Sequence, residues 1–309
     1  MFDNKNRLHI ELTSRCTLAC PACARTVWKN LLKTPIPKAD LDIDSLAKFL
    51  DCDKGRSIDR FLLCGDIGDP IYYPQLFDFI KRFRDTKKFD IRTNGSYQTE
   101  EFWNTLASLL GPQDTITFGI DGLEDTNQLY RKNSDWKSIM LGVDIMVKSS
   151  TNVLWQTIIF KFNQDHLDKI QAFAESKGTK FFTRISDRFN DDNLIPAQQH
   201  VQTQFLFKEE YNKNQPIKID ALCNKEHVIT ADGYFFPCNW IRHPQVFYKS
   251  ELWRQKSKWL ENLKLENTDL DQALITINDW AQYVEHSGIH NPDKVSIICK
   301  MKCREGCND

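Results

Sequence analysis

The chain has 309 residues, of which 41% are hydrophobic and 27% charged, the composition of a folded globular protein with a sizeable core. Its 41 basic and 42 acidic residues leave a net charge of −1, which argues against nucleic-acid binding through excess positive charge. The sequence holds no apolar run near the roughly 20 residues of a membrane span, and its start lacks the apolar core of a signal peptide. We therefore expect a cytoplasmic protein with reduced thiols and no membrane partner.

Strand-like and helix-like segments alternate through the first two thirds of the chain. Six such strand–helix units in a row favour a parallel sheet, either open or closed into a barrel. Because the strand pattern ends near residue 186, we predict an α/β fold with a partial, TIM-like (β/α)6 barrel. The predicted strands are 7–13, 59–65, 89–95, 114–122, 152–162 and 179–186, and the predicted helices are 44–52, 73–85, 99–110, 134–150 and 165–178.

The pattern changes after the sixth strand. Residues 187–204 are polar and predict a linker or loop. A hairpin pattern follows at 227–238, and the remaining chain is rich in tryptophan and cysteine. We therefore predict two domains, a barrel over residues 1–205 and a small α+β domain over residues 206–309.

Three of the ten cysteines, Cys16, Cys20 and Cys23, fall within eight positions directly after the first predicted strand. A tetrahedral metal site wants four thiolate or imidazole ligands, and no fourth ligand is close in the sequence. Either a distant residue completes the set, or the open position binds something other than protein. A structural zinc site and three unrelated core cysteines are the alternatives. Iron–sulfur clusters normally take four cysteines, so three suggest a [4Fe-4S] cluster with one iron free.

This C-x3-C-x2-C loop resembles the signature of the radical S-adenosylmethionine (SAM) superfamily. In that family the free iron binds the amino and carboxylate groups of SAM. Reduction then cleaves SAM to a 5′-deoxyadenosyl radical, which removes a hydrogen atom from the substrate. The resemblance implies that Cys16, Cys20 and Cys23 hold the cluster and that SAM is the missing fourth ligand.

Three further segments are similar to the family's SAM-binding turns, and each ends a predicted strand. They are "GDIGDP" (65–70), "RTNG" (92–95) and "GIDG" (119–122). Each alone is also typical of an ordinary glycine turn, but the ends of barrel strands are where active sites collect. Ile67 and Ala22 depart from the family pattern, and Ala22 stands where an aromatic residue usually packs near the adenine. The resemblance implies SAM contacts from Gly68, Asp69, Pro70, Asn94, Asp121 and Arg131.

The last third carries a second resemblance, to the SPASM or Twitch extension that holds an auxiliary cluster. A full SPASM extension has seven cysteines for two clusters, whereas five are present here, so the shorter form is favoured. A zinc knuckle is the alternative, because four thiolates also suit zinc. The implied ligands of a second [4Fe-4S] cluster are Cys223, Cys238 and two of Cys299, Cys303 and Cys307.

These features predict a radical SAM enzyme of oxidoreductase type. An auxiliary cluster suggests a net oxidation, either dehydrogenation or bond formation, of a small-molecule or peptide substrate, with flavodoxin or ferredoxin as electron donor. Asn239 stands where the sulfatase-maturing branch has an aspartate base, which disfavours that branch, and the sequence identifies no catalytic acid or base. The alternatives are a non-catalytic iron–sulfur electron carrier or sensor, and an RNA-modifying radical SAM enzyme, which the balanced charge disfavours.

Overall fold

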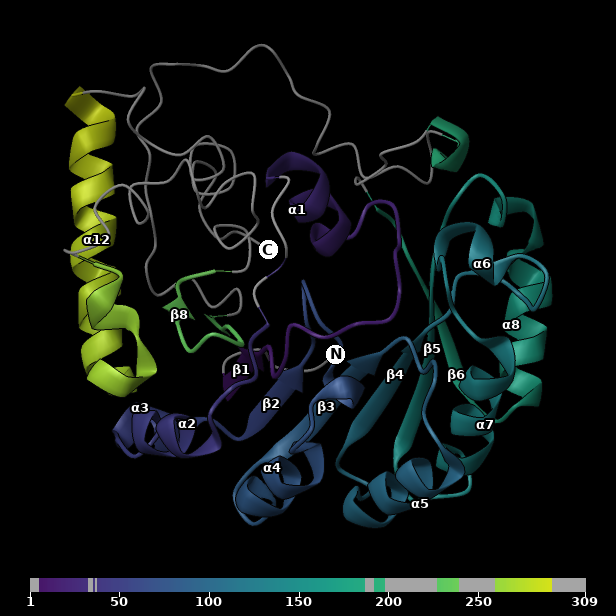
Figure 1. Cartoon of the computed structure of the whole chain (residues 1–309), viewed down its shortest axis with the longest axis horizontal. Helices are drawn as coiled ribbons and strands as arrows, with labels where there is room; N and C mark the ends of the chain where they lie inside the picture. Colours follow the sequence, from purple (N-terminus) through teal and green to yellow (C-terminus); the bar gives the residue numbers. More distant parts are fainter. Residues whose placement is uncertain are drawn as a thin grey trace. The chain divides into compact units, whose positions relative to one another are not determined.

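The computed structural model describes residues 6–32, 36, 38–186, 192–197, 227–238 and 259–290. Within these ranges eight strands form one sheet in the order β6-β5-β4-β3-β2-β1-β7-β8 (Figure 1). Strands β3 to β6 pair in parallel, as do β1 and β7, whereas β8 is antiparallel to β7. The strands are β1 (Arg7–Ile10), β2 (Arg60–Leu63), β3 (Lys88–Thr93), β4 (Thr115–Gly119), β5 (Asn152–Ile158), β6 (Lys180–Arg184), β7 (Val228–Ile229) and β8 (Phe235–Phe236).

Helices follow most of the strands. A short 3-10 helix, η2 (Pro70–Tyr72), comes between β2 and α4. The α-helices are α1 (Ala24–Leu32), α2 (Ile43–Phe49), α3 (Asp53–Ser57), α4 (Leu76–Phe83), α5 (Glu100–Leu109), α6 (Asn127–Tyr130), α7 (Trp136–Met146), α8 (Leu167–Ser176) and α12 (Leu270–His290).

The predicted α/β class and the mostly parallel sheet are confirmed. Each of the six predicted strands contains one of β1 to β6, apart from a one-residue difference where β3 starts, and each predicted helix contains a helix of the structure, apart from a one-residue difference where α2 starts. The predicted hairpin at 227–238 is the β7–β8 pair. Closure of the sheet into a partial barrel stays a prediction, as does the C-terminal auxiliary domain, most of which lies outside the described residues.

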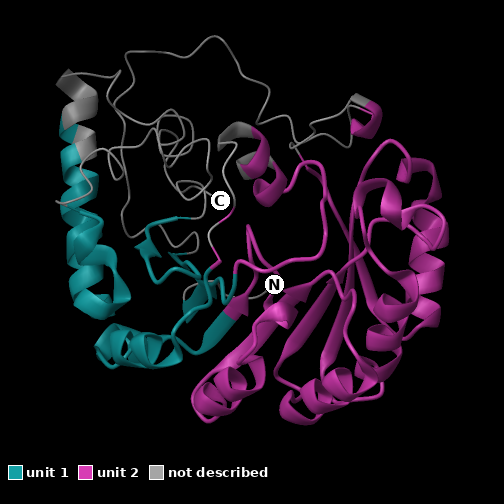
Figure 2. Ribbon diagram, viewed as in Figure 1, with its two compact units in different colours: residues 1–13, 39–61, 210–309 teal, residues 14–38, 62–209 magenta. Residues whose placement is uncertain are grey.

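The chain divides into two compact units, and each is discontinuous in sequence (Figure 2). Unit 1 comprises residues 1–13, 39–61 and 210–309, and unit 2 comprises residues 14–38 and 62–209. The domain boundary that the sequence suggests, between residues 205 and 206, stays a prediction.

Aromatic side chains attach the helices of unit 2 to one face of its sheet. Phe118 of β4 lies 5.5 Å from Trp103 of α5, measured between ring centroids, and Trp155 of β5 lies 6.0 Å from Phe173 of α8. Successive side chains of a strand point to opposite faces, so the neighbours of Phe118 and Trp155 point away from these helices. We call that opposite face the inner face.

In unit 1 the hairpin extends the sheet beside the first strand. His9 and Ile10 of β1 are in register with Val228 and Ile229 of β7. Gly233 lies in the turn between β7 and β8 with a φ of 80°, a conformation that other residues rarely adopt. Unlike the strands of the first two thirds, this parallel pairing of β1 with β7 was not predicted from the sequence.

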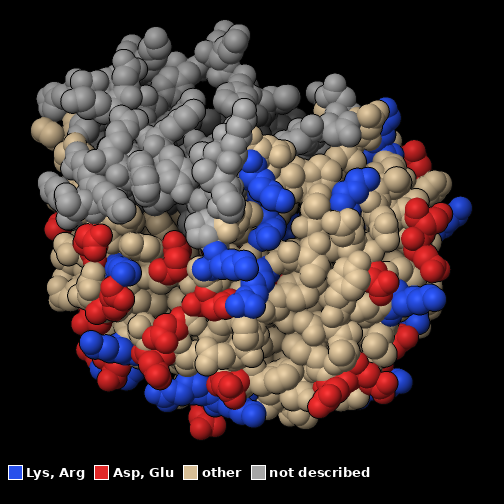
Figure 3. Space-filling model, in the orientation of Figure 1, with Lys and Arg blue, Asp and Glu red and all other residues tan. Residues whose placement is uncertain are grey.

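None of the helices in the described ranges is long and apolar enough to cross a membrane. Basic and acidic side chains are intermixed over the described part of the face shown in Figure 3. That mixture agrees with the near-zero net charge of the sequence.

Asp42 caps α2, and we expect its loss to destabilise the protein in a pH-dependent way. Its Oδ2 accepts a hydrogen bond from Ser45 N at 2.7 Å, and the hydrogen bonding with Ser45 lowers the pKa of the Asp42 carboxyl. A carboxyl whose pKa is lowered by folding contributes stability above its unfolded-state pKa and loses it as the pH falls through the folded-state pKa. Asp42→Ala should therefore lower the free energy of unfolding by about 1 kcal/mol near neutral pH, and by less in acid, in urea titrations. Asp42→Asn keeps an acceptor and is the matched control, and an equal loss at both pH values would contradict this account.

Candidate functional site

The loop between β1 and α1 holds the three predicted cluster ligands, Cys16, Cys20 and Cys23. Cys20 is buried in an apolar cluster together with Leu18 and Ala22, and Cys16 and Cys23 pack against the same cluster. Within the loop, Cys23 N donates a hydrogen bond to Cys20 O at 3.2 Å. All three cysteines of the C-x3-C-x2-C pattern therefore contact the same group of apolar side chains.

The surroundings of these thiols disfavour their ionisation. Burial raises the pKa of Cys16 to about 12, with a further contribution from the charge of Asp69. Burial also raises the pKa of Cys20 to about 11, against the opposing effect of the Arg131 guanidinium. Each pKa is raised further by the neighbouring cysteines. Thiolates in this loop are therefore costly without a cation, and metal binding would displace their protons.

Asp69 connects the end of β2 to the end of β3. Its Oδ1 accepts hydrogen bonds from Thr93 Oγ1 at 2.8 Å and from Ile71 N at 3.2 Å. Its Oδ2 accepts from Asn94 N at 2.7 Å and from Asn94 Nδ2 at 2.6 Å. Burial raises the pKa of the Asp69 carboxyl, and the hydrogen bonds from Asn94, Thr93 and Ile71 act against this. The two predicted SAM contacts Asp69 and Asn94 thus lie together.

Asn94 also reaches the cysteine loop. Its Nδ2 lies 3.8 Å from Cys16 Sγ, which also accepts a hydrogen bond from Leu18 N at 3.4 Å. Gly95 follows with a φ of 75°, and a Cβ there would lie 2.8 Å from the Phe118 ring. Glycine is therefore required at this turn, which lets Asn94 end its strand beside the first cysteine.

Asp121 and Arg131 form a buried ion pair beside the same loop. Arg131 Nε donates to Asp121 Oδ2 at 2.6 Å, and Ile158 N donates to Asp121 Oδ1 at 2.7 Å. Burial raises the pKa of Asp121, with the positive charge of Arg131 opposing it. A Cβ on Gly119 would lie 2.8 Å from Arg131 Nη2, so glycine at that position makes room for the guanidinium. The predicted site residues Asp121 and Arg131 therefore bind each other.

The other predicted SAM contacts, Gly68 and Pro70, lie on either side of Asp69. Pro70 is buried and begins η2. Gly68 closes a tight turn, because its carbonyl oxygen would lie 2.4 Å from a Cβ on Gly65. A direct contact between SAM and any of these residues stays a prediction.

Tyr72 is a part of this region that sequence reasoning missed. Its hydroxyl lies 2.8 Å from Thr17 Oγ1 and donates to Ser96 O at 2.7 Å. It thereby joins the cysteine loop, η2 and the turn after β3. The sequence offers no local signal for this role, because the three segments are distant along the chain.

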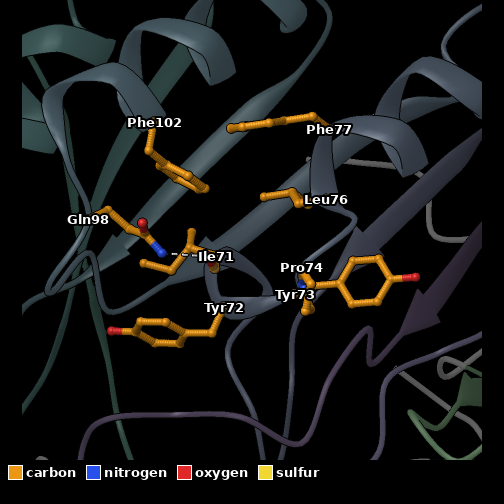
Figure 4. Close-up of a pocket in the computed structure, with 8 residues that line it drawn as sticks. All are labelled: Ile71, Tyr72, Tyr73, Pro74, Leu76, Phe77, Gln98 and Phe102. Atoms are coloured by element: carbon orange, nitrogen blue, oxygen red, sulfur yellow. Dashed lines mark hydrogen bonds between the residues drawn. The ribbon is translucent and has the colours of Figure 1, made fainter.

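A pocket of about 300 Å³ lies beside Tyr72 (Figure 4). Gln98 Nε2 donates to Ile71 O at 2.6 Å across its wall, drawn as the dashed line in Figure 4. None of the predicted site residues lines it. The pocket walls are mainly apolar and aromatic and come from Ile71, Tyr72, Tyr73, Pro74, Leu76, Phe77, Gln98 and Phe102.

Of the five predicted auxiliary-cluster ligands, only Cys238 belongs to the described residues. It follows β8 and is partly exposed. Among the described residues, no group of three or more His, Cys, Asp and Glu side chains is arranged to hold a metal ion. The first and the second cluster therefore both stay predictions. The other proposed ligands of the second cluster, Cys223, Cys299, Cys303 and Cys307, lie outside the described residues.

The donor chemistry of the first loop fits the cluster that the resemblance implies. Three thiols, one for each of three irons, come from a single loop whose neighbours Asp69, Asn94 and Arg131 are polar. Thiolates are the ligands that iron–sulfur clusters use. The raised thiol pKa values are consistent with this fit, because thiolates buried here need a cation beside them.

No known protein-family profile matches the chain. Over 120 residues it is 32% identical to the tungsten-containing aldehyde ferredoxin oxidoreductase cofactor-modifying protein of Pyrococcus furiosus. The match covers 38% of this chain and 31% of that protein, so the chain matches about a third of its curated relative.

The fold is similar to those of two solved proteins. The structure of anSMEcpe with bound AdoMet (S-adenosylmethionine) matches 90% of this chain and 83% of its own, with a TM-score of 0.54 and 12% identity. The structure of Streptococcus suis SuiB bound to S-adenosylmethionine matches 98% of this chain and 72% of its own, with a TM-score of 0.57 and 13% identity. At this level of identity the two matches describe the fold alone.

Proposed function

We propose that this protein is a radical SAM enzyme. The observation that carries the proposal is that the cysteine loop lies beside the residues that follow β3 and β4. Asn94 after β3 lies beside Cys16, and the Asp121–Arg131 pair after β4 acts on Cys20. The three thiols would hold the iron–sulfur cluster, and the neighbouring carboxylate, amide and guanidinium groups would bind an amino-acid ligand of that cluster.

In this proposal Cys16, Cys20 and Cys23 hold a [4Fe-4S] cluster whose fourth iron binds SAM. When bound, that cluster supplies the electron that cleaves SAM. Asp69 and Asn94 would orient the methionine amino group, and the Nη atoms of Arg131 would meet its carboxylate. Asp121 holds the Arg131 side chain in place through the 2.6 Å contact with Nε.

The fold likeness to anSMEcpe and SuiB, each solved with S-adenosylmethionine bound, supports this reading. We further propose a net oxidation of a small-molecule or peptide substrate. Electrons would come from a flavodoxin- or ferredoxin-type donor, and a second [4Fe-4S] cluster on Cys223, Cys238 and two of the last three cysteines would take an electron from the substrate. The Pyrococcus furiosus relative is described as cofactor-modifying, so cofactors belong among the candidate substrates.

The test is SAM cleavage by the full chain, reconstituted with iron and sulfide without oxygen and reduced with dithionite. We expect 5′-deoxyadenosine and methionine in equal amounts, measured by liquid chromatography and mass spectrometry. An electron carrier would take up the electron and leave SAM intact. A fully loaded, reducible cluster without SAM cleavage would therefore defeat the proposal and favour the carrier.

A further inference from the structure

A polar strip crosses the inner face of the sheet in unit 2. Paired residues of neighbouring strands point to the same face, and so do residues two apart on one strand. Phe118 and Trp155 face the helices, so residues one position away from them face inward. In the sheet, Arg92 is in register with Thr117, Thr117 with Leu154, Gln156 with Phe182 and Ile158 with Arg184. Arg92, Thr117, Gln156 and Arg184 therefore lie on the inner face.

Among the described residues, no acidic side chain pairs with either arginine of this strip. Within the described residues, the guanidiniums of Arg92 and Arg184 make no ion pair or hydrogen bond, and Arg184 lies only over the Phe182 ring, 5.7 Å from its centroid. By contrast, Arg84 of the same unit has a carboxylate partner, Asp114, at 2.7 Å. Asp90 lies on the same face as Arg92 and is buried.

The positive charge of Arg92 also acts on Arg184 across this face. Burial lowers the pKa of Arg184, and the charge of Arg92 lowers it further. Like charges held together on rigid strands are unfavourable, and an anion between them removes that cost. Arg92 is partly exposed and Arg184 is exposed, so both are open to a ligand.

Polar groups lie between the two arginines, next to the proposed SAM site. Gln156 is partly exposed, and its side-chain amide has no hydrogen-bond partner among the described residues. Arg92 is two residues before Asn94. Ile158, the register partner of Arg184, donates its N–H to Asp121. A ligand on this strip would therefore lie beside the proposed SAM site.

We infer that Arg92 and Arg184 bind an anionic group of the substrate, a carboxylate or a phosphate, with Gln156 as a further hydrogen-bond partner. This inference rests on the proposed function, since it assigns the substrate class of the same site. Guanidinium groups bind both anions through paired, charge-assisted hydrogen bonds. A substrate held in this way would present its uncharged part to the cysteine loop.

The test measures anion binding to the full, iron-loaded chain without oxygen, by titration calorimetry with inorganic phosphate and separately with succinate. We expect at least one of the two anions to bind, and the one that binds identifies the group. Arg92→Gln and Arg184→Gln should each weaken that binding roughly tenfold or more. Arg56→Gln, which removes an exposed arginine of unit 1, is the matched control and should leave binding unchanged.

Melting temperatures measured without anion distinguish a role of Arg92 and Arg184 in anion binding from a purely structural role. Because each substitution removes one of two repelling charges, both variants should melt at or above the wild-type temperature. Lower melting temperatures with unchanged anion binding would overturn the inference, as would binding of neither anion. Displacement of the bound anion by SAM would also overturn it, because the arginines would then hold SAM's own carboxylate.

The two proposals fail separately, since anion binding is measured without turnover. SAM cleavage by a chain that binds neither phosphate nor succinate defeats the substrate inference alone. Arginine-dependent anion binding in a chain that never cleaves SAM supports the anion site and defeats the proposed chemistry.

Discussion

Replacing Cys16, Cys20 and Cys23 together with alanine is expected to remove about half of the bound iron and to abolish SAM cleavage. Half of the iron should remain because a second cluster would be held by cysteines of the last third of the chain. Cleavage should stop completely because no other thiol of the chain belongs to this loop. Iron would be measured by a colorimetric assay after reconstitution, and 5′-deoxyadenosine by mass spectrometry.

Cys52→Ala is the matched control for this experiment. Cys52 is buried in unit 1, and its thiol donates to Phe49 O at 3.8 Å. The control should keep its full iron content and its cleavage rate. SAM cleavage at an unchanged rate in the triple variant would show that the loop does not carry the chemistry.

Breaking the Asp121–Arg131 pair is expected to lower the free energy of unfolding by about 3–5 kcal/mol, the largest stability effect that we predict. The Asp121 side chain is fully buried and that of Arg131 is 17% exposed, so Arg131→Met leaves a carboxylate in the interior without its counter-charge. Urea unfolding of the metal-free chain, followed by tryptophan fluorescence, measures the loss. SAM affinity should fall as well, if Arg131 meets the carboxylate.

The Lys177–Asp144 pair is the matched control, since it joins the same kinds of charge at 2.9 Å with side chains 28% and 45% exposed. Lys177→Met should cost less than about 1 kcal/mol, because solvent screens an exposed pair. The double variant Asp121→Leu, Arg131→Met should recover part of the loss, because it leaves no unpaired charge in the interior. Equal costs for the buried and the exposed pair would contradict the burial argument.

The sequence predicts the first two thirds of the fold well because the evidence there is local. Each strand and helix carries its own apolar pattern within about ten residues. Helix α1 was missed, since residues 24–32 directly follow the cysteine loop and read as its continuation. The β1–β7 pairing was missed for another reason, because no residue pattern within β1 or β7 indicates which distant strand it pairs with.

The candidate site was predicted in part. The sequence placed Asp69, Asn94 and Asp121 at strand ends, and the structure brings Asp69 and Asn94 into contact. The sequence does not indicate that Asp121 binds Arg131, because this pairing depends on the space that Gly119 leaves for the guanidinium. Nor were Arg92 and Arg184 singled out, because their neighbourhood depends on the register of four strands.

The pairing of β1 with β7 has a consequence for how the chain is made. During synthesis β1 leaves the ribosome early. Roughly 220 more residues must then be made before its partner strand β7 exists. Until then one backbone edge of β1 is unpaired, and such an edge can associate with other chains. A fragment ending at residue 205 would carry this edge permanently, so the first predicted domain expressed by itself should aggregate. Supplying residues 206–309 as a separate polypeptide during refolding would cover the edge and keep the fragment in solution.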